Sequence, residues 1–265
     1  MLQYNKYMLR EIIEKYGKEK VNTLTKYPSI LTLHKFGERG RFTNGITTNI
    51  EGETMYASEK IDGTNVRIIC YGEEFLVGSR NNILHYSKDF YWDESMGIVN
   101  QFYKMNLPVV QPDKLTIIFG ELFGGKITAN SKDYGKEDHG YRVFDIAIID
   151  DLDILEESIT AISNWRESSL DSSIDDTLAY GQRFLNLDEL KSYNFDLVSQ
   201  IEFELENFEH LTVLNALEKY ISQTNVALTE TARGGTEGVV LRNHDRTKIV
   251  KLRFEDYRRT LKSKK

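Results

Sequence analysis

Residues 59–65 read Glu-Lys-Ile-Asp-Gly-Thr-Asn, and they stand between two strand-like runs, Thr54–Ala57 and Val66–Tyr71. This arrangement predicts that Lys60 lies in a tight turn at the edge of a sheet, where its side chain faces a pocket. An ordinary lysine amine carries a proton at neutral pH, so a nucleophilic lysine needs a nearby cation or metal ion that favours its neutral form. The segment therefore indicates a candidate reactive lysine.

Two neighbours of this lysine suit a ligand site. Gly63 lets a ligand approach the backbone closely, and Asp62 provides a carboxylate for hydrogen bonds from the turn or from a ligand hydroxyl. The alternative interpretation is an exposed lysine in an Asp-Gly hairpin turn, a common use of that dipeptide.

The composition is that of a globular protein. Of 265 residues, 40% are hydrophobic and 28% are charged, and only 3 are proline. No apolar run approaches the length of a membrane span, and no basic segment followed by an apolar stretch opens the chain, so we expect a cytoplasmic protein, bacterial or from a virus-infected cell. The single cysteine, Cys70, excludes an internal disulfide and is expected to be a packed strand residue.

The net charge of −7 argues against a generic basic nucleic-acid coat, although it does not describe local patches. Two basic clusters are candidates for contact with phosphates, and for the C-terminal one a frayed, solvated tail is the alternative interpretation. One comprises Arg258, Arg259, Lys262, Lys264 and Lys265 at the C-terminal end, and the other comprises Lys26, His34, Lys35, Arg39 and Arg41.

Hydrophobic spacing predicts one α+β domain built on antiparallel sheets. A helix is expected over Leu2–Tyr16, ended by Gly17, and another over Phe208–Ile221 with Leu211, Leu214, Leu217 and Ile221 on its buried stripe. Acidic, serine-rich residues 150–176 are expected to form an insertion of helix and loop. The further strands are expected at Phe75–Val77, Leu115–Leu122, Arg142–Ile149, Gly238–Arg242 and Lys248–Leu252.

Charged residues stand where several of these strands would place apolar ones. Glu121 is flanked by apolar residues, and Glu237 comes just before an apolar strand. A carboxylate in such a place needs a cation or hydrogen-bond donors. Residues 248–253 alternate cations with aliphatic residues, which puts Lys251 and Arg253 on one cationic face. With Lys60, these residues provide an amine, carboxylates for a metal ion and cations for a polyphosphate.

The order of these segments resembles that of a known class. The segments are Lys60-Ile61-Asp62-Gly63, Ser79-Arg80, Phe119-Gly120-Glu121, Arg142-Val143-Phe144-Asp145, Glu237-Gly238-Val239-Val240 and Val250-Lys251-Leu252-Arg253. They resemble motifs I, Ia, III, IIIa, IV and V of the covalent nucleotidyltransferases, which include the polynucleotide ligases and mRNA capping enzymes. Glu59 and the Thr64-Asn65 pair narrow the resemblance to the RNA ligase 2-like branch of ATP-dependent RNA ligases.

The resemblance implies a nucleotidyltransferase (adenylyltransferase) domain of antiparallel sheets with flanking helices, and a three-step reaction. Lys60 would attack the α-phosphate of ATP, AMP would pass from the lysine to a 5′-phosphate end, and a 3′-hydroxyl would displace it. The implied partners are RNA ends, including nicks in RNA-containing duplexes, and the implied cofactors are ATP and Mg²⁺ or Mn²⁺.

The resemblance also implies a role for each site residue. Lys251 would contact the α-phosphate and Glu237 would help to hold the metal ion, so both are catalytic candidates beside Lys60. The nucleotide-binding candidates are Glu59, which would help to read the base, Ile61, Asp62, Gly63, Asn65 for the later steps, Arg80 at the ribose or RNA end, Glu121 at a ribose hydroxyl, Phe144 stacked on adenine, Lys251 and Arg253.

Two departures from the pattern affect the expectations. Arg253 stands where the branch usually has lysine, which keeps the charge and changes its geometry. The few residues after motif V leave no room for a C-terminal OB domain, so we expect none. A protein partner could supply a second domain. The expected organisation is a lead-in of helix and strands over 1–50 within the same domain, a nucleotidyltransferase domain over 51–257 with a helical insertion at about 150–225, and a basic tail over 258–265.

Two alternative functions stay open. One is a minimal DNA ligase or a GTP-dependent capping-type nucleotidyltransferase, against which the missing OB domain argues. The other is a catalytically inactive nucleic-acid-binding relative, against which the intact Lys60, Glu121, Glu237 and Lys251 argue.

Overall fold

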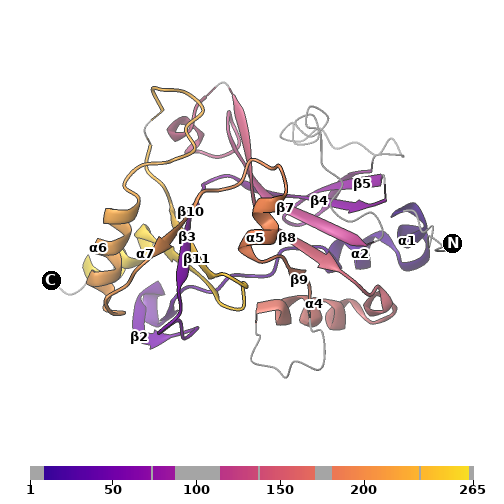
Figure 1. Cartoon of the computed structure of the whole chain (residues 1–265), viewed down its shortest axis with the longest axis horizontal. Coiled ribbons are helices and arrows are strands. Elements are labelled where there is room, and N and C mark those ends of the chain that lie inside the picture. The colour runs from indigo at the N-terminus through magenta and orange to yellow at the C-terminus, as the bar shows by residue number, and fades with distance from the viewer. Residues whose placement is uncertain are drawn as a thin grey trace. The chain divides into compact units, whose positions relative to one another are not determined.

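The computed structural model describes residues 9–72, 74–86, 114–136, 138–170, 181–232 and 234–262. The chain forms two compact units, each assembled from three segments (Figure 1). Unit 1 comprises Met1–Pro28, Thr64–Leu122 and Tyr141–Leu197, and unit 2 comprises Ser29–Gly63, Phe123–Gly140 and Val198–Lys265. The expected lead-in over 1–50 and the insertion at about 150–225 each contribute to both units, so the expected domain division stays a prediction.

Unit 1 is built on a six-stranded sheet of order β6-β5-β4-β7-β8-β9. Neighbouring strands β4 and β5, β4 and β7, β5 and β6, and β8 and β9 pair in antiparallel fashion. The strands are β4 (Thr64–Tyr71), β5 (Glu74–Ser79), β6 (Ile83–Tyr86), β7 (Leu115–Gly124), β8 (His139–Ile149) and β9 (Arg183–Phe184).

One face of this sheet is covered by helices. Ile117 and Phe119 occupy alternate positions of β7, so both side chains project from the same face of the sheet. They pack in one core with Leu9 of α1, Val21 of α2 and Ile162 of α4. The helices of unit 1 are α1 (Leu9–Tyr16), α2 (Lys18–Leu24), α4 (Ile159–Glu167) and α5 (Leu187–Ser192), with short 3-10 helices at Asp153–Glu156 and Ser168–Leu170.

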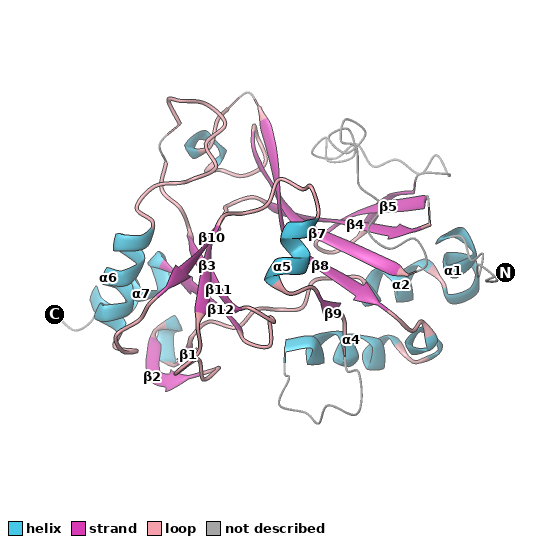
Figure 2. Ribbon diagram, in the orientation of Figure 1, coloured by secondary structure: helices cyan, strands magenta, loops and turns pink. Residues whose placement is uncertain are grey.

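Unit 2 contains a four-stranded antiparallel sheet of order β10-β3-β11-β12 and a β1-β2 hairpin (Figure 2). Its elements are β1 (His34–Phe36), a 3-10 helix (Glu38–Gly40), β2 (Phe42–Ile46), β3 (Met55–Lys60), a second 3-10 helix (Ser131–Asp133), β10 (Gln200–Phe203), α6 (His210–Tyr220), β11 (Gly238–Asn243), β12 (Ile249–Arg253) and α7 (Phe254–Lys262). One face of this sheet forms the core of unit 2. Ala57, Val239 and Leu252 of the strands pack there with Leu217 of α6 and Tyr257 of α7.

Most of the expected elements are present. The structure confirms an α+β fold on antiparallel sheets, the strands predicted around residues 75, 115, 142, 238 and 248, and the helix predicted from Phe208. Gly17 ends α1 with φ of 87°, as expected, but a second helix follows at once. Leu211 is 56% exposed, so its place on the buried stripe of α6 was predicted wrongly.

Two expectations near the candidate site need correction. Lys60 is the last residue of β3 and does not lie in the turn. Because β3 and β4 belong to different sheets, the hairpin alternative is wrong. The predicted basic tail begins inside α7, since Arg258, Arg259 and Lys262 are helical, while Lys264 and Lys265 lie outside the described residues. Among the described helices, none has the length and apolar character needed to span a bilayer.

Candidate active site

Strand pairing in unit 2 brings three predicted residues together. Gly238 of β11 pairs with Lys60 of β3 and with Arg253 of β12, so these positions form one row across the sheet. Glu237 precedes Gly238 directly and therefore stands at the end of the same row. The sheet thus gathers an amine, a carboxylate and a guanidinium from segments far apart in the sequence.

An ion pair joins Lys60 to Glu237. The lysine Nζ donates a hydrogen bond to Oε2 of Glu237, and the two side chains are 27% and 30% exposed. Nη1 of Arg253 lies 3.8 Å from the other oxygen of the same carboxylate. Lys60 therefore lies at a partly enclosed site, beside the acid predicted to hold a metal ion.

The two motif V cations lie on the same face of the sheet. Lys251 and Arg253 are two residues apart on β12, and Arg253 shares its row with Lys60, so all three side chains project from the face opposite the core. Two strand spacings put the backbones of β3 and β12 roughly 10 Å apart, a gap that two lysine side chains can bridge to a shared phosphate. Lys251 is half-buried, and its backbone amide donates to Leu31 at 2.8 Å.

Arg253 is also held from α7. Its Nε and Nη2 donate to the carboxylate of Asp256 at 2.7 and 3.1 Å. Partial burial is the largest single effect and lowers the pKa of Arg253, but the hydrogen bonds and charge of Asp256, together with the charges of Glu237 and Glu255, raise the pKa overall. The motif therefore keeps a fixed cation where the branch usually has lysine.

The turn after Lys60 is clasped by a loop that follows β7. The backbone amide of Asp62 donates to the hydroxyl of Tyr134 at 2.8 Å, and the amide group of Asn130 donates to its carboxylate at 2.6 Å. Tyr134 is fully buried, and burial raises the pKa of its phenol, so the hydroxyl is neutral. Thr236 adds a hydrogen bond to the carbonyl of Lys60 at 3.3 Å. Both sides of the lysine are thus fixed in place.

Gly238 has a steric reason to be glycine. Its φ is 153°, and a Cβ atom there would lie 2.0 Å from the carbonyl oxygen of Leu252 and 2.9 Å from Cα of Arg253. Only a residue without a side chain allows β11 and β12 to approach this closely. The close approach positions Glu237 and Arg253 beside Lys60.

Glu59 projects away from the lysine. Alternation along β3 puts it on the core face with Val239, its partner on β11, and it is 7% exposed. Its Oε2 accepts a hydrogen bond from the backbone amide of Asn225 at 2.7 Å. Burial raises the pKa of this carboxyl, partly opposed by hydrogen bonds from Thr224 and Asn225. The predicted role of Glu59 in reading the base stays a prediction.

Two further candidates lie side by side in unit 1. Asn65 of β4 pairs with Glu121 of β7, so their side chains project from the same face. Oδ1 of Asn65 is buried and has no hydrogen-bond partner among the residues that the structure describes. Gly120 is required beside them because a Cβ atom would lie 2.3 Å from the ring of Tyr141.

Arg80 is exposed at the end of β5, and its backbone is held by Arg67. Arg67 is fully buried, donates to the carbonyls of Ser79 and Arg80, and contacts Asn22 of α2. Burial lowers its pKa to about 9, so it stays charged at neutral pH. The guanidinium fits because Gly78 leaves room for it.

Phe144 is half-buried in unit 1. Its ring meets that of Tyr27 edge to face at 5.1 Å, and the Tyr27 hydroxyl donates to Asp145 at 2.7 Å. The predicted stacking of Phe144 on adenine stays a prediction, as do the nucleotide contacts of Ile61, which is 4% exposed, and Gly63.

The carboxylate of Glu237 is a suitable ligand for a divalent metal ion. The described residues contain no group of three or more His, Cys, Asp or Glu side chains that could hold an ion by themselves. Mg²⁺ usually takes one or two carboxylates and completes its shell with water and substrate phosphates. A single carboxylate beside a phosphate site is therefore a suitable protein ligand for it.

Sequence reasoning missed the residues that position the predicted ones. Tyr134, Asn130, Thr236 and Arg67 carry no motif, and each acts through a contact that the strand pattern does not reveal. No sequence signal showed that the loop after the Gly124-Gly125 pair returns to Asp62.

The family is shown by comparison with known proteins. A model of the RNA ligase family matches residues 53–264, most of the chain. The chain therefore belongs to the RNA ligase family, within the nucleotidyltransferase superfamily, and the predicted membership is confirmed. No protein with a curated description matches it.

The fold is similar to that of solved RNA ligase structures from Naegleria gruberi. A variant with ATP and manganese gives a TM-score of 0.47 at 14% identity, covering 93% of this chain and 63% of that one. A variant with AMP and manganese gives 0.46 at 14% identity, with 87% and 62% covered, and the enzyme with pyrophosphate gives 0.44 at 16% identity, with 89% and 64% covered. The chain thus spans less than two thirds of the length of these proteins.

Proposed function

We propose that this protein is an ATP-dependent RNA ligase that joins 5′-phosphate and 3′-hydroxyl ends through a covalent lysyl-AMP. The observation that carries the proposal is the row of Lys60, Glu237 and Arg253 on one sheet face, with Lys251 on the same face. Family membership supports the same chemistry.

In the first step Nζ of Lys60 forms a bond to the α-phosphorus of ATP, and the bond from that phosphorus to the bridging oxygen of pyrophosphate breaks. Lys251 and Arg253 suit the charge that develops on the phosphate oxygens, because fixed cations stabilise the transition state more than the substrate. A bound Mg²⁺ or Mn²⁺ would neutralise Glu237 and the triphosphate, and so favour the neutral amine.

The second step takes place at the same phosphorus atom, and the third takes place at the phosphorus of the RNA 5′-phosphate. The 5′-phosphate of an RNA end displaces Lys60, so the nitrogen–phosphorus bond breaks and a phosphoanhydride to AMP forms. A 3′-hydroxyl then attacks the 5′-phosphate and releases AMP. Asn65, whose buried Oδ1 has no partner in the described part of the chain, is the candidate for contact with the RNA end.

Self-labelling tests the first step. The protein is incubated with Mg²⁺ and ATP or GTP labelled at the α-phosphate, and label on the denatured chain is measured. We expect label from ATP, none with Lys60→Ala, and unchanged label with Lys248→Ala, a lysine of the same unit that pairs with Glu53 instead. Asn65→Ala should keep the label and lose joining of RNA strands.

Other outcomes would favour the alternatives. Label from GTP alone would indicate a capping-type enzyme, and joining of DNA but not RNA strands would indicate a DNA ligase. No label from either nucleotide would indicate a binding protein. Label on Lys60→Ala would refute the assigned nucleophile.

A further inference from the structure

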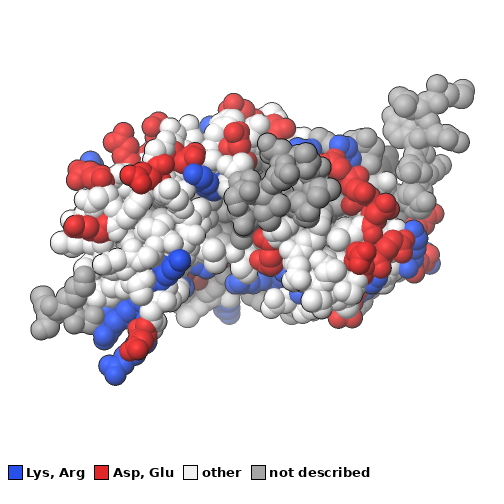
Figure 3. Space-filling view, turned by 90° about the horizontal axis from the view of Figure 1, so that it is seen from below, with Lys and Arg blue, Asp and Glu red and all other residues white. Residues whose placement is uncertain are grey.

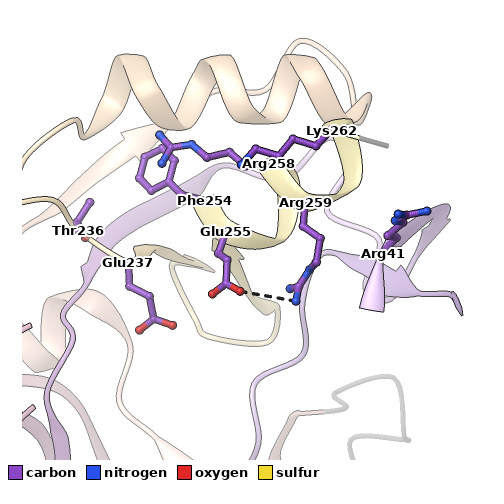
Figure 4. Close-up of a pocket in the computed structure, with 8 residues that line it drawn as sticks. All are labelled: Arg41, Thr236, Glu237, Phe254, Glu255, Arg258, Arg259 and Lys262. Atoms are coloured by element: carbon purple, nitrogen blue, oxygen red, sulfur yellow. Dashed lines mark ion pairs between the residues drawn. The ribbon is translucent and has the colours of Figure 1, made fainter. Parts of the chain in front are cut away.

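Unit 2 contains a groove along α7 that begins at the candidate active site. The groove has a volume of about 630 Å³, and we call it the α7 groove (Figure 4). Its lining residues are Arg41, Thr236, Glu237, Phe254, Glu255, Arg258, Arg259 and Lys262. Glu237, the partner of Lys60, lies at one end of this surface in Figure 4, and Arg41 lies at the other, with Lys262 toward the same side.

The lining carries four cationic side chains against two carboxylates. Both carboxylates are already paired, Glu237 with Lys60 and Glu255 with Arg259. Arg41 and Lys262 are exposed, and neither side chain has an ion pair with any residue in the described ranges. Figure 3 shows a few basic side chains, with acidic ones among them, at the end of unit 2 that carries α7. The groove therefore has cationic charge available to an anion.

Of the other two cations, Arg259 is bound to Glu255 and to the buried carboxylate of Asp256, whereas Arg258 is paired only weakly. Arg258 contacts Glu218 at 3.1 Å, and both side chains are about half exposed. Exposed ion pairs contribute little and give way to a stronger anion. The guanidinium of Arg258 also lies 4.9 Å from the centre of the Phe254 ring.

The groove is held in a fixed shape. The backbone amide of Phe42, next to Arg41, donates to the hydroxyl of Thr260 at 2.9 Å, which ties the β1-β2 hairpin to α7. Tyr257 of α7 is fully buried, and its hydroxyl lies 2.9 Å from Nδ1 of His34 on β1. A site on such rigid elements binds a ligand with a small cost in ordering.

The length of the groove favours a chain of phosphates over a single small anion. From Phe254 to Lys262 the helix rises roughly 12 Å, at 1.5 Å per residue. Consecutive phosphates of a stacked strand rise about 3.4 Å along its axis, so several fit this length and a pyrophosphate does not fill it.

We propose that the α7 groove binds the phosphate backbone of the RNA strand whose end is presented to Lys60. The proposal rests on the function proposed above and adds the path of the substrate. Arg41 and Lys262 contact phosphates at the far end of the groove, and Arg258 exchanges Glu218 for a phosphate as the strand binds.

Salt-dependent RNA binding tests the groove. Binding of a labelled single-stranded RNA with a 5′-phosphate is measured by fluorescence anisotropy at several salt concentrations. The variant is Arg41→Ala/Lys262→Ala, and its matched control is Lys191→Ala/Lys219→Ala, which removes two exposed lysines outside the groove. Each lost phosphate contact lowers the slope of log K against log salt by about 0.7, so the two substitutions together lower it by about 1.4. If the two proteins bind equally at about 1 M salt, the groove variant should bind roughly 25-fold more weakly at about 0.1 M salt.

Self-labelling with ATP is measured on the same proteins. We expect the groove variant to label as the wild type does and to transfer AMP to RNA more slowly. Equal slopes for the groove variant and the wild type, or an equal loss in the control, would overturn the proposal. A parallel loss of labelling would show that the groove holds the triphosphate instead. Failure of the wild type to label would refute the proposed ligase function while leaving the binding result readable.

Discussion

The hydroxyl of Tyr134 gives a sharp test of how the active-site turn is held. Tyr134→Phe removes the acceptor for the Asp62 amide at 2.8 Å and keeps the buried ring. A buried donor left without its partner costs about 1–3 kcal/mol. If about 1–2 kcal/mol of this cost affects the position of Lys60 in the transition state, labelling slows roughly 5- to 30-fold, at about 1.4 kcal/mol per tenfold.

Tyr220→Phe is the matched control. Tyr220 of α6 donates a hydrogen bond to the carbonyl of Ala57 at 2.7 Å, so it contacts the backbone of β3 itself and not the turn that follows it. Its substitution should lower the free energy of unfolding by about 1 kcal/mol, the net contribution of one hydrogen bond, without moving the turn. Both variants therefore lose stability, and only the Tyr134 variant should lose labelling rate.

The assay is the single-turnover rate of lysyl-AMP formation at saturating ATP, measured beside urea unfolding of each variant. A rate loss in Tyr134→Phe that exceeds the loss in Tyr220→Phe supports a positioning role. Equal rates for the two variants would refute it, because the clasp on Asp62 would then contribute stability alone.

Two further predictions concern stability. Gly238→Ala should lower the free energy of unfolding by at least about 1–3 kcal/mol, from the unfavourable φ alone, whereas Gly235→Ala, whose Cβ would meet nothing within 4 Å, should be close to neutral in urea unfolding. Burial and the neighbouring His210 lower the pKa of His34, against a smaller opposing effect of its hydrogen bond to Phe208. The unfolded chain then binds a proton more readily, so stability should fall as pH drops below about 6.5. A His34→Gln variant should show a shallower fall between pH 7.5 and 5.5, and an equal fall would exclude His34 as the cause.

The strands that form the site could be predicted from sequence because their pattern is local. Alternation over residues 248–253 predicted Lys251 and Arg253 on one face, and the pairing of β12 with β11 confirms it. Glu237 before an apolar strand was predicted as an acid in need of a cation, and it contacts Lys60. The order of the motifs indicated which segments contribute to the same site. It did not indicate the register in which their strands pair.

Contacts between distant loops could not be predicted, because nothing in the chain near either partner encodes them. Asn130 and Tyr134 lie 68 and 72 residues from Asp62, in a loop whose own sequence indicates only a turn. Helix α2 was missed for a related reason. Seven residues are too few for a stable isolated helix, and this one is fixed by tertiary contacts such as that of Asn22 with the buried Arg67.

The side chain of Glu59 projects from one face of β3, and the alternation of side chains along this strand predicts which face it is. Side chains of a strand alternate between its two faces, so once Lys60 belongs to the strand its predecessor must project to the other face. The run Met55, Ala57 and Glu59 shares one face, and the first two residues are buried in the core of unit 2. A carboxylate there meets the Asn225 amide behind the sheet, on the face opposite the side chain of Lys60. The period of the strand, applied through residue 60, therefore places the side chains of Glu59 and Lys60 on opposite faces of the sheet, and the role of each in the reaction stays a prediction.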